Sequence, residues 1–243
     1  MQRRRLSPAN RMVLSLGTLK PILRTGGQVF RPKMDVLPTP QRFMWPQLGT
    51  VPRNFVLYGG TALALRLGHR QSVDFDFFCN EAFAPEQLFA AMNLPRDSRV
   101  DQRGDNTLSV FVHEVNLSFF GDVRMNRVHD PDVADNGLQV ASLLDLIATK
   151  LKTIQQRAEA KDYQDLAAAL RAGTKLEEAL AAAIAVFGPK FNAIATLKAL
   201  TYFEDGDLRT VPANLQKQLE TAASAVDADA LPELNARTGI VRE

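Results

Sequence analysis

The order of apolar and polar residues divides this chain into two parts. Before about residue 140, apolar residues come in short runs and alternations that are typical of strands. After Ser142 they recur at helical spacing, at Leu143, Ile147, Leu151 and Ile154, and Ser142 is the predicted N-cap of that helix. The pattern predicts an α+β fold, in which a small mixed β-sheet with helices precedes a mostly α-helical half.

Glycines, prolines and polar clusters set the limits of the expected elements. The predicted strands cover residues 55–59, 73–78, 107–112 and 115–120, with a tight turn at His113 and Glu114 between the last two. The predicted helices, besides the one that follows Ser142, cover residues 40–48, 61–67, 85–92, 160–172, 176–187, 190–203 and 213–225. Residues 121–140 are polar and predict a loop.

Composition places the chain among ordinary soluble globular proteins. Of its 243 residues, 46% are hydrophobic and 23% are charged, which is enough apolar material for a sizeable core. The one cysteine, Cys79, excludes an internal disulfide and fits a reducing compartment. No apolar run is long enough to span a bilayer. We therefore expect a cytoplasmic protein with no membrane partner.

Charge is distributed unevenly along the chain. Residues 1–33 hold eight of the 29 basic residues and no acid, whereas the remainder sets 21 basic residues against 27 acidic ones. Such a basic segment could bind nucleic acid or resemble a targeting sequence. We favour a third interpretation, a poorly ordered extension before a natural start at Met34. The expected regions are then the extension 1–33, a sheet core over 34–140 and a helical region over 141–243.

Asp74 and Asp76 form the most informative pair in the sequence. Residues i and i+2 of a strand project from the same face, so both carboxylates share one side while Val73, Phe75 and Phe77 point into the core on the other. Two like charges repel, and a divalent cation removes that cost. Hard oxygen ligands of this kind suit Mg²⁺. The alternative is a solvated edge strand, although the phenylalanines make this strand unusually apolar for an edge.

A glycine turn precedes this strand. Gly59 and Gly60 let the backbone approach a ligand closely, and the helix that begins near Thr61 offers free N–H groups to a phosphate. Ser72 adds a hydroxyl just before the acids. Such turns are often purely structural, and the absence of a lysine after the glycines excludes a Walker-type loop.

The run from Gly59 to Phe78 resembles the AbiEii/AbiGii toxin family of the polymerase-beta-like nucleotidyltransferase superfamily, whose pattern is Gly-Gly, a spacer, then Asp-x-Asp. Within this run, Arg70 and Ser72 lead into the acids as they do in the family. Two further segments are similar to the family: the block Lys150, Arg157, Lys161, Asp162 and Asp165, and the tail 197–207. The resemblance covers about residues 38–235. The resemblance implies a nucleotidyltransferase core over residues 34–140 and transfer of an NMP from an NTP. It implies Mg²⁺ as cofactor, an RNA or tRNA acceptor, and a cognate antitoxin.

The implied site residues fall into two sets. Catalysis is expected of Asp74, Asp76 and Lys150, with the two aspartates holding the metal. Nucleotide binding is expected of Gly59, Gly60, Thr61, Ser72, Lys150 and Arg157.

The second block has a physical interpretation of its own. Lys150 and Arg157 are seven residues apart, nearly two helical turns, so one helix could aim both cations at a triphosphate. Alternatively Lys150 lies on a solvated surface, and Asp162 and Asp165 pair with Lys161 or Arg157.

One departure from the superfamily pattern affects catalysis. Active members usually carry a third carboxylate on a neighbouring strand, but the same-face positions here are Asn116 and Ser118. Glu114 and Asp122 are the nearest substitutes in sequence. The alternative function is therefore a catalytically degenerate member that binds a nucleotide or a protein.

Overall fold

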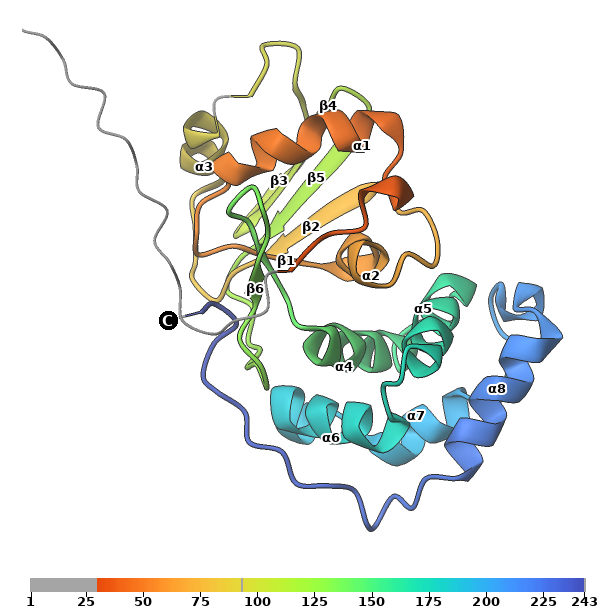
Figure 1. Cartoon of the computed structure of the whole chain (residues 1–243). Coiled ribbons are helices and arrows are strands. Elements are labelled where there is room, and N and C mark those ends of the chain that lie inside the picture. Colours follow the sequence, from red (N-terminus) through yellow and green to blue (C-terminus); the bar gives the residue numbers. More distant parts are fainter. Residues whose placement is uncertain (1–29, 93, 243) are drawn as a thin grey trace, which may run out of the picture.

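The computed structural model describes residues 30–92 and 94–242 and has a mixed sheet followed by helices (Figure 1). Within these residues the sheet has seven strands in the order β3-β4-β5-β2-β1-β7-β6. Their bounds are β1 Val56–Tyr58, β2 Asp74–Phe78, β3 Arg99–Gly104, β4 Thr107–Val112, β5 Val115–Phe120, β6 Asp132–Val133 and β7 Gln139–Val140. The α+β class predicted from the sequence is confirmed.

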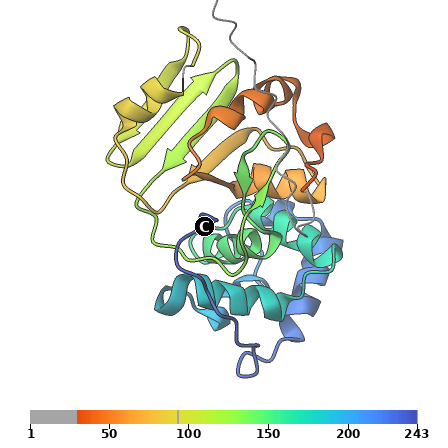
Figure 2. The same cartoon turned by 60° about the vertical axis from the view of Figure 1, so that its left-hand side comes forward.

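Helices interrupt the sheet segments and then fill the second half of the chain (Figure 2). The helices are α1 Thr39–Met44, α2 Gly59–Leu67, α3 Pro85–Ala91, α4 Leu143–Ile154, α5 Ala160–Arg171, α6 Leu176–Phe187, α7 Ala193–Ala199 and α8 Ala213–Ser224. Short 3₁₀ segments lie at Met34–Val36, Trp45–Thr50, Gly188–Lys190 and Leu208–Thr210.

Strand β2 lies in the middle of the sheet. It pairs antiparallel with β1 and parallel with β5, so it is not the edge strand of the alternative interpretation. Phe75 and Phe77 are fully buried on one face, where Phe75 lies 6.4 Å from Trp45 and Phe77 stacks at 4.8 Å on Phe119. This apolar face anchors β2, and its other face carries the acids.

Several boundaries differ from the sequence-based prediction. The predicted helix 40–48 is α1 followed by a 3₁₀ segment, because Pro46 interrupts the α-helical bonding. The predicted helix 190–203 shrinks to α7, which begins after the N-cap Asn192. Strand β3 was not expected because its residues are mostly polar and exposed, and pairing with β4 holds it in the sheet. The loop 121–140 contains the short strands β6 and β7.

Two local predictions are confirmed. His113 and Glu114 both have positive φ, 47° and 65°, in the turn that joins β4 to β5. The Ser142 hydroxyl accepts a hydrogen bond from the Asp145 amide and caps α4.

The chain ends of the described region contact the core. Lys33 donates its backbone amide to the Leu65 carbonyl, and the Arg66 guanidinium lies 4.5 Å from the centre of the Phe30 ring. Most of the predicted 1–33 extension, residues 1–29, lies outside the described residues. At the other end, the backbones of Arg237 and Arg127 form an isolated antiparallel β-bridge. The Ile240 amide donates to the side-chain oxygen of Asn80 (2.7 Å). The last segment therefore runs back from the helices to the sheet (Figure 1).

In the part of the chain that the structure describes, no single helix is long and apolar enough to cross a membrane. Two helical segments, Leu176–Lys190 and Ala193–Ala199, meet the criteria of length and apolar composition only when they are taken together, and the chain bends by 119° between them.

Candidate active site

The acid-bearing face of β2 lines a cavity of about 620 Å³ between the sheet and the helical half. Asp74 is exposed and Asp76 is partly buried, and both side chains contribute to its wall. Val73 was predicted to point into the core with Phe75 and Phe77, which is wrong. It precedes the first residue of β2, is 52% exposed and lies at the rim of the same cavity.

The glycine pair lies opposite these acids, at the start of α2. Gly59 has a φ of +73°, and a Cβ there would overlap the Asp76 Oδ2 atom. A Cβ on Gly60 would lie 2.6 Å from Arg70 Nη2 and 3.2 Å from Ser72 Oγ. Glycine is therefore required at position 59, where φ is positive and the Asp76 carboxylate is close, whereas a side chain at position 60 would have to displace the ends of Arg70 and Ser72.

Thr61 lies behind the cavity wall. It is fully buried, and its hydroxyl donates to the backbone carbonyl of Asp74. It does not line the cavity, unlike Gly59, Gly60 and Ser72. Its position therefore favours fixing the start of β2 against α2, and gives the predicted contact with nucleotide no geometric support.

The opposite wall comes from α4, from the connection to α5 and from the first turn of α5. It consists of Thr149, Lys150, Thr153, Gln156, Arg157 and Lys161.

Asp76 has an unusual electrostatic environment. Burial, followed by the neighbouring charge of Asp74, raises the pKa of Asp76 to about 6, although Lys150, Lys161 and Arg157 lower it. No hydrogen bond to the Asp76 carboxylate is present among the described residues. A cation between the two carboxylates would remove the repulsion, so this donor set of hard oxygens fits Mg²⁺.

Lys150 lies in a buried network of ion pairs. Its ammonium group is 2.7 Å from Asp162 Oδ1 and 2.8 Å from Asp165 Oδ2, and only 8% of its side chain is exposed. The solvated-surface alternative for Lys150 is therefore wrong. Arg70 also binds Asp165 through two hydrogen bonds (2.6 and 2.9 Å), and His69 Nε2 lies 2.7 Å from the same carboxylate.

These contacts control the ionisation of Asp165. Burial opposes its charge, but the hydrogen bonds from His69 and Arg70 and the charge of Lys150 together hold its pKa below the usual range. Asp165 is thus an ionised carboxylate that joins β2's lead-in segment to α4 and α5.

Arg157 does not extend a helical row from Lys150, as the spacing predicted. Helix α4 ends at Ile154, and Arg157 lies in the turn before α5. The Arg157 Nε atom donates to Asp162 (2.9 Å), which raises the pKa of Arg157, and Lys161 pairs with Glu159 at 2.8 Å. The Asp162–Arg157 pair expected from the alternative interpretation is present, and Arg157 still lines the cavity.

The neighbouring strand carries neutral residues where a third acid was sought. Asn116 is the register partner of Asp74, and Ser118 is the partner of Asp76. Ser109 donates to the Asn116 side-chain oxygen (2.9 Å) and lies 3.2 Å from the Ser118 hydroxyl, so these side chains form a neutral hydrogen-bonded cluster.

The two substitutes considered for that acid lie elsewhere. Glu114 and Asp122 are exposed residues with positive φ at strand ends, and neither lines the cavity. Within residues 30–92 and 94–242, no group of three or more His, Cys, Asp or Glu side chains is placed to hold a metal. The carboxylate pair is therefore the metal-ligand set offered by this part of the chain.

Comparison with known proteins identifies the family. The model of the family described as "Nucleotidyl transferase AbiEii toxin, Type IV TA system" matches residues 47–116 and 104–235. The chain belongs to this family. The resemblance that the sequence motifs indicated is confirmed, and both the Gly59–Asp76 region and the Lys150–Asp165 block lie inside the matched ranges.

The chain is also similar to two individual proteins. An uncharacterized protein of Aquifex aeolicus (strain VF5), aq_aa25, is 34% identical over 160 residues, which cover 63% of this chain and 75% of that protein. The structure of MenT4, a nucleotidyltransferase toxin from Mycobacterium tuberculosis H37Rv, aligns with a TM-score of 0.53 at 17% identity. That alignment covers 77% of this chain and 84% of MenT4 and shows a shared fold.

Sequence reasoning did not select every residue of the cavity wall. Arg70 was noted only as part of the lead-in to the acids, yet its guanidinium lies over Gly60. Thr149, Thr153 and Gln156 gave no signal, since polar residues on one side of a helix are typical of any solvated face.

Proposed function

We propose that this protein is a Mg²⁺-dependent nucleotidyltransferase that moves an NMP from an NTP to a hydroxyl group of an RNA acceptor, with tRNA as the first candidate. The observation that carries the proposal is the meeting of Asp74 and Asp76 with the N-terminus of α2 in one cavity. The family description supports nucleotidyl transfer in general. The metal and the acceptor are our inference from the donor set and from the resemblance.

Each side of the cavity has its own part in binding the nucleotide. Asp74 and Asp76 would hold Mg²⁺, which supplies positive charge at the α-phosphate when bound. The backbone N–H groups at Gly59 and Gly60 donate to phosphate oxygens, because a helix N-terminus favours negative charge. The Ser72 hydroxyl adds a donor beside them.

Cations on the far wall hold the rest of the triphosphate. Arg157 and Lys161 are exposed and reach the cavity from the α4–α5 connection and from the first turn of α5, respectively. Lys150 is already paired with Asp162 and Asp165, so it acts through its charge, which favours the ionised form of Asp76. Lys150 therefore holds Asp162 and Asp165 in place and contributes positive charge beside Asp76.

The reaction follows from this arrangement. The acceptor hydroxyl oxygen bonds to the α-phosphorus, the bond from that phosphorus to the bridging oxygen breaks, and pyrophosphate leaves. The hydroxyl proton passes to water, since Asn116 and Ser118 offer no carboxylate in the expected position.

The test is transfer of label from each α-labelled NTP to total tRNA, with and without Mg²⁺. We expect labelled RNA from the wild-type protein and none from the Asp74→Ala or Asp76→Ala variants. Asp229→Ala is the matched control, because Asp229 is an exposed aspartate outside the cavity. Undiminished labelling by either cavity variant would refute the mechanism.

A second candidate function follows from the neutral Asn116 and Ser118 positions. A member without a third acid could bind nucleotide without transferring it. Calorimetric titration with MgATP and MgCTP distinguishes the two: heat of binding without labelled product in the transfer assay favours the binding module.

The family description also implies a partner protein, since it names a type IV toxin–antitoxin system. We propose that a cognate antitoxin restrains this protein in the cell. Growth arrest on expression of the wild type, absent for the Asp76→Ala variant and relieved by the product of the adjacent gene, is the expected result.

A further inference from the structure

A second hollow lies next to the candidate active site. It measures about 230 Å³ and shares Gln156 and Arg157 with the wall of the large cavity. Its remaining lining comes from the end of α4 and the turn after it, from α5, and from the end of α7 and the segment that follows: Ile154, Gln155, Ala158, Tyr163, Ala199, Tyr202, Asp205 and Leu208. The two spaces therefore meet across the Gln156–Arg157 turn.

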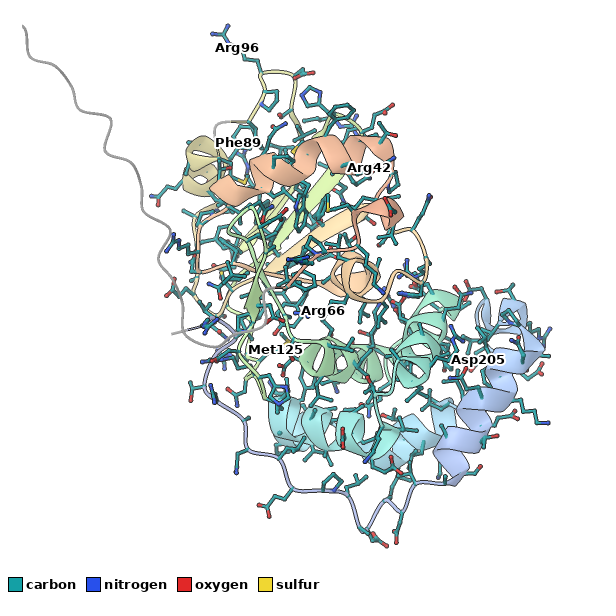
Figure 3. All side chains as sticks on the ribbon, viewed as in Figure 1. Arg42, Arg66, Phe89, Arg96, Met125 and Asp205 are labelled. Atoms are coloured by element: carbon teal, nitrogen blue, oxygen red, sulfur yellow. The ribbon has the colours of Figure 1, made fainter. Side chains whose placement is uncertain are left out.

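The chemistry of this hollow differs from that of the large cavity. Arg157 is its one cationic lining residue within the described chain, and that guanidinium is paired with Asp162 (2.9 Å) and Glu159 (3.2 Å). The Asp205 carboxylate adds negative charge, and it lines the hollow together with Tyr163 of α5 (Figure 3). Among the described residues, the hollow therefore offers a triphosphate no cation beyond Arg157, which the large cavity already shares.

The same hollow suits a flat, uncharged ring with polar edges. Tyr202 exposes 52% of its surface, while the next residue, Phe203, is 7% exposed and packs 5.8 Å from Tyr163. Gln156 is exposed, and its side-chain amide makes no hydrogen bond to any described residue. An aromatic face with an amide beside it can stack a nucleobase and bind its edge.

Tyr202 is held by a segment that is fixed against the active-site turn. The Ala160 amide donates to Asp207 Oδ1 (2.6 Å), so Asp207 caps the start of α5. A Cβ on Gly206 would overlap the Ala158 carbonyl, and the Tyr163 hydroxyl donates to Ala199 (3.1 Å). The backbone on both sides of Tyr202 is thus fixed before binding, so stacking has to order only the Tyr202 side chain, which limits its entropic cost.

We propose that this hollow binds the terminal base of a single-stranded RNA acceptor, with Tyr202 as the stacking residue and Gln156 as the hydrogen-bonding one. The inference rests on the proposed function and names its acceptor subsite. The large cavity is of a size that encloses a whole small-molecule ligand, so it accommodates the NTP by itself. The adjoining hollow is then free for the acceptor, whose end must reach the α-phosphate.

The experiment measures binding of a fluorescently labelled, single-stranded RNA hexamer with a free 3′ end by anisotropy. Removing a stacked base from its aromatic partner corresponds to a loss of affinity of about 5- to 150-fold. We expect a loss in this range for Tyr202→Ala and near wild-type affinity for Tyr202→Phe. Ile194→Ala is the matched control, because Ile194 is a 55% exposed apolar residue on α7 outside the hollow, and it should bind as the wild type does.

Kinetics of transfer separate this inference from the proposed function. Tyr202→Ala should raise KM for RNA and leave KM for the NTP unchanged. Equal hexamer affinity of Tyr202→Ala and wild type, no hexamer binding at all, or a change confined to KM for the NTP would each overturn the subsite. Hexamer binding that depends on Tyr202, in a protein that transfers no NMP, would support the subsite and refute the transferase.

Discussion

Replacing Asp76 by Asn should stabilise the metal-free protein at neutral pH. The unfolded chain has an ordinary carboxyl with a pKa of 3.8, whereas burial and the charge of Asp74 raise the pKa of Asp76 to about 6 in the folded state. Between these values the folded state binds the proton more tightly than the unfolded state, so the free energy of unfolding falls as pH rises. Above pH 6 the loss is complete, and below pH 4 it is absent.

The size of the effect follows from the shift. A pKa difference of about 2 units corresponds to about 3 kcal/mol of unfolding free energy. Asn resembles the protonated carboxyl in shape and never ionises, so the variant escapes this loss. In a chain of this length the gain corresponds to a rise in Tm of about 6–12 °C at pH 8.

Urea denaturation of wild type and Asp76→Asn at pH 4 and pH 8, in EDTA, measures the difference directly. The two proteins should have equal stability at pH 4, and the variant should be more stable at pH 8. Asp229→Asn, which changes an exposed aspartate that forms no ion pair with the described residues, should follow the wild type at both values. A variant no more stable than wild type at pH 8 would refute the reasoning about Asp76.

Magnesium supplies a second check on the same residue. An ion held by the two carboxylates favours their charged forms, so Mg²⁺ should stabilise the wild type at pH 8 and narrow its difference from Asp76→Asn. An equal Mg²⁺ effect on both proteins would place the ion elsewhere.

Three other substitutions test the supporting structure. Asp165→Asn removes a buried carboxylate from its cationic partners and should cost about 3–5 kcal/mol in urea denaturation, while an effect below about 1 kcal/mol would contradict the ion network. Gly59→Ala and Gly137→Ala both place alanine at positive φ, at a cost of about 1–2 kcal/mol in unfolding free energy. Gly59→Ala should lower Tm more than Gly137→Ala does, because its Cβ meets Asp76. An equal fall in Tm for the two variants would show that the Asp76 carboxylate moves freely. Ser118→Asp puts a third acid opposite Asp76, so its Tm should be lower than that of wild type in EDTA and should rise more on addition of Mg²⁺. An Mg²⁺-induced rise in Tm equal to that of wild type would argue against position 118 as a metal-ligand position.

Local chemistry made the acid strand and the glycine pair predictable from sequence. Alternation around Phe75 and Phe77 fixes which face of β2 is buried, and the two aspartates must then share the other. The Gly-Gly pair predicted that another group approaches the backbone closely, and the structure identifies Asp76 and Arg70 as the side chains that do so.

Tertiary contacts determined what the sequence left open. Spacing put Lys150 and Arg157 on one helix, but α4 ends three residues before Arg157, and the chain turns there to bring Asp162 back to both cations. The sequence suggested the Asp162–Arg157 pair only as an alternative and gave no sign of the Asp162–Lys150 pair, because aspartates near a helix start are ordinary. Strand β3 depends in the same way on its partner β4, since its polar residues would not form a strand alone.

The charges around the cavity explain why a metal is central to the proposal. Arg70, Lys150, Arg157 and Lys161 supply four positive charges near its wall, but Asp162, Asp165 and Glu159 pair with them, and Asp74 and Asp76 face them. Four cations against five carboxylates leave a formal charge of −1, so the metal-free cavity has no net attraction for a triphosphate. A divalent ion on the carboxylate pair reverses that sign. Nucleotide binding and metal binding should therefore occur together, with the acids of β2 as the point at which they are coupled.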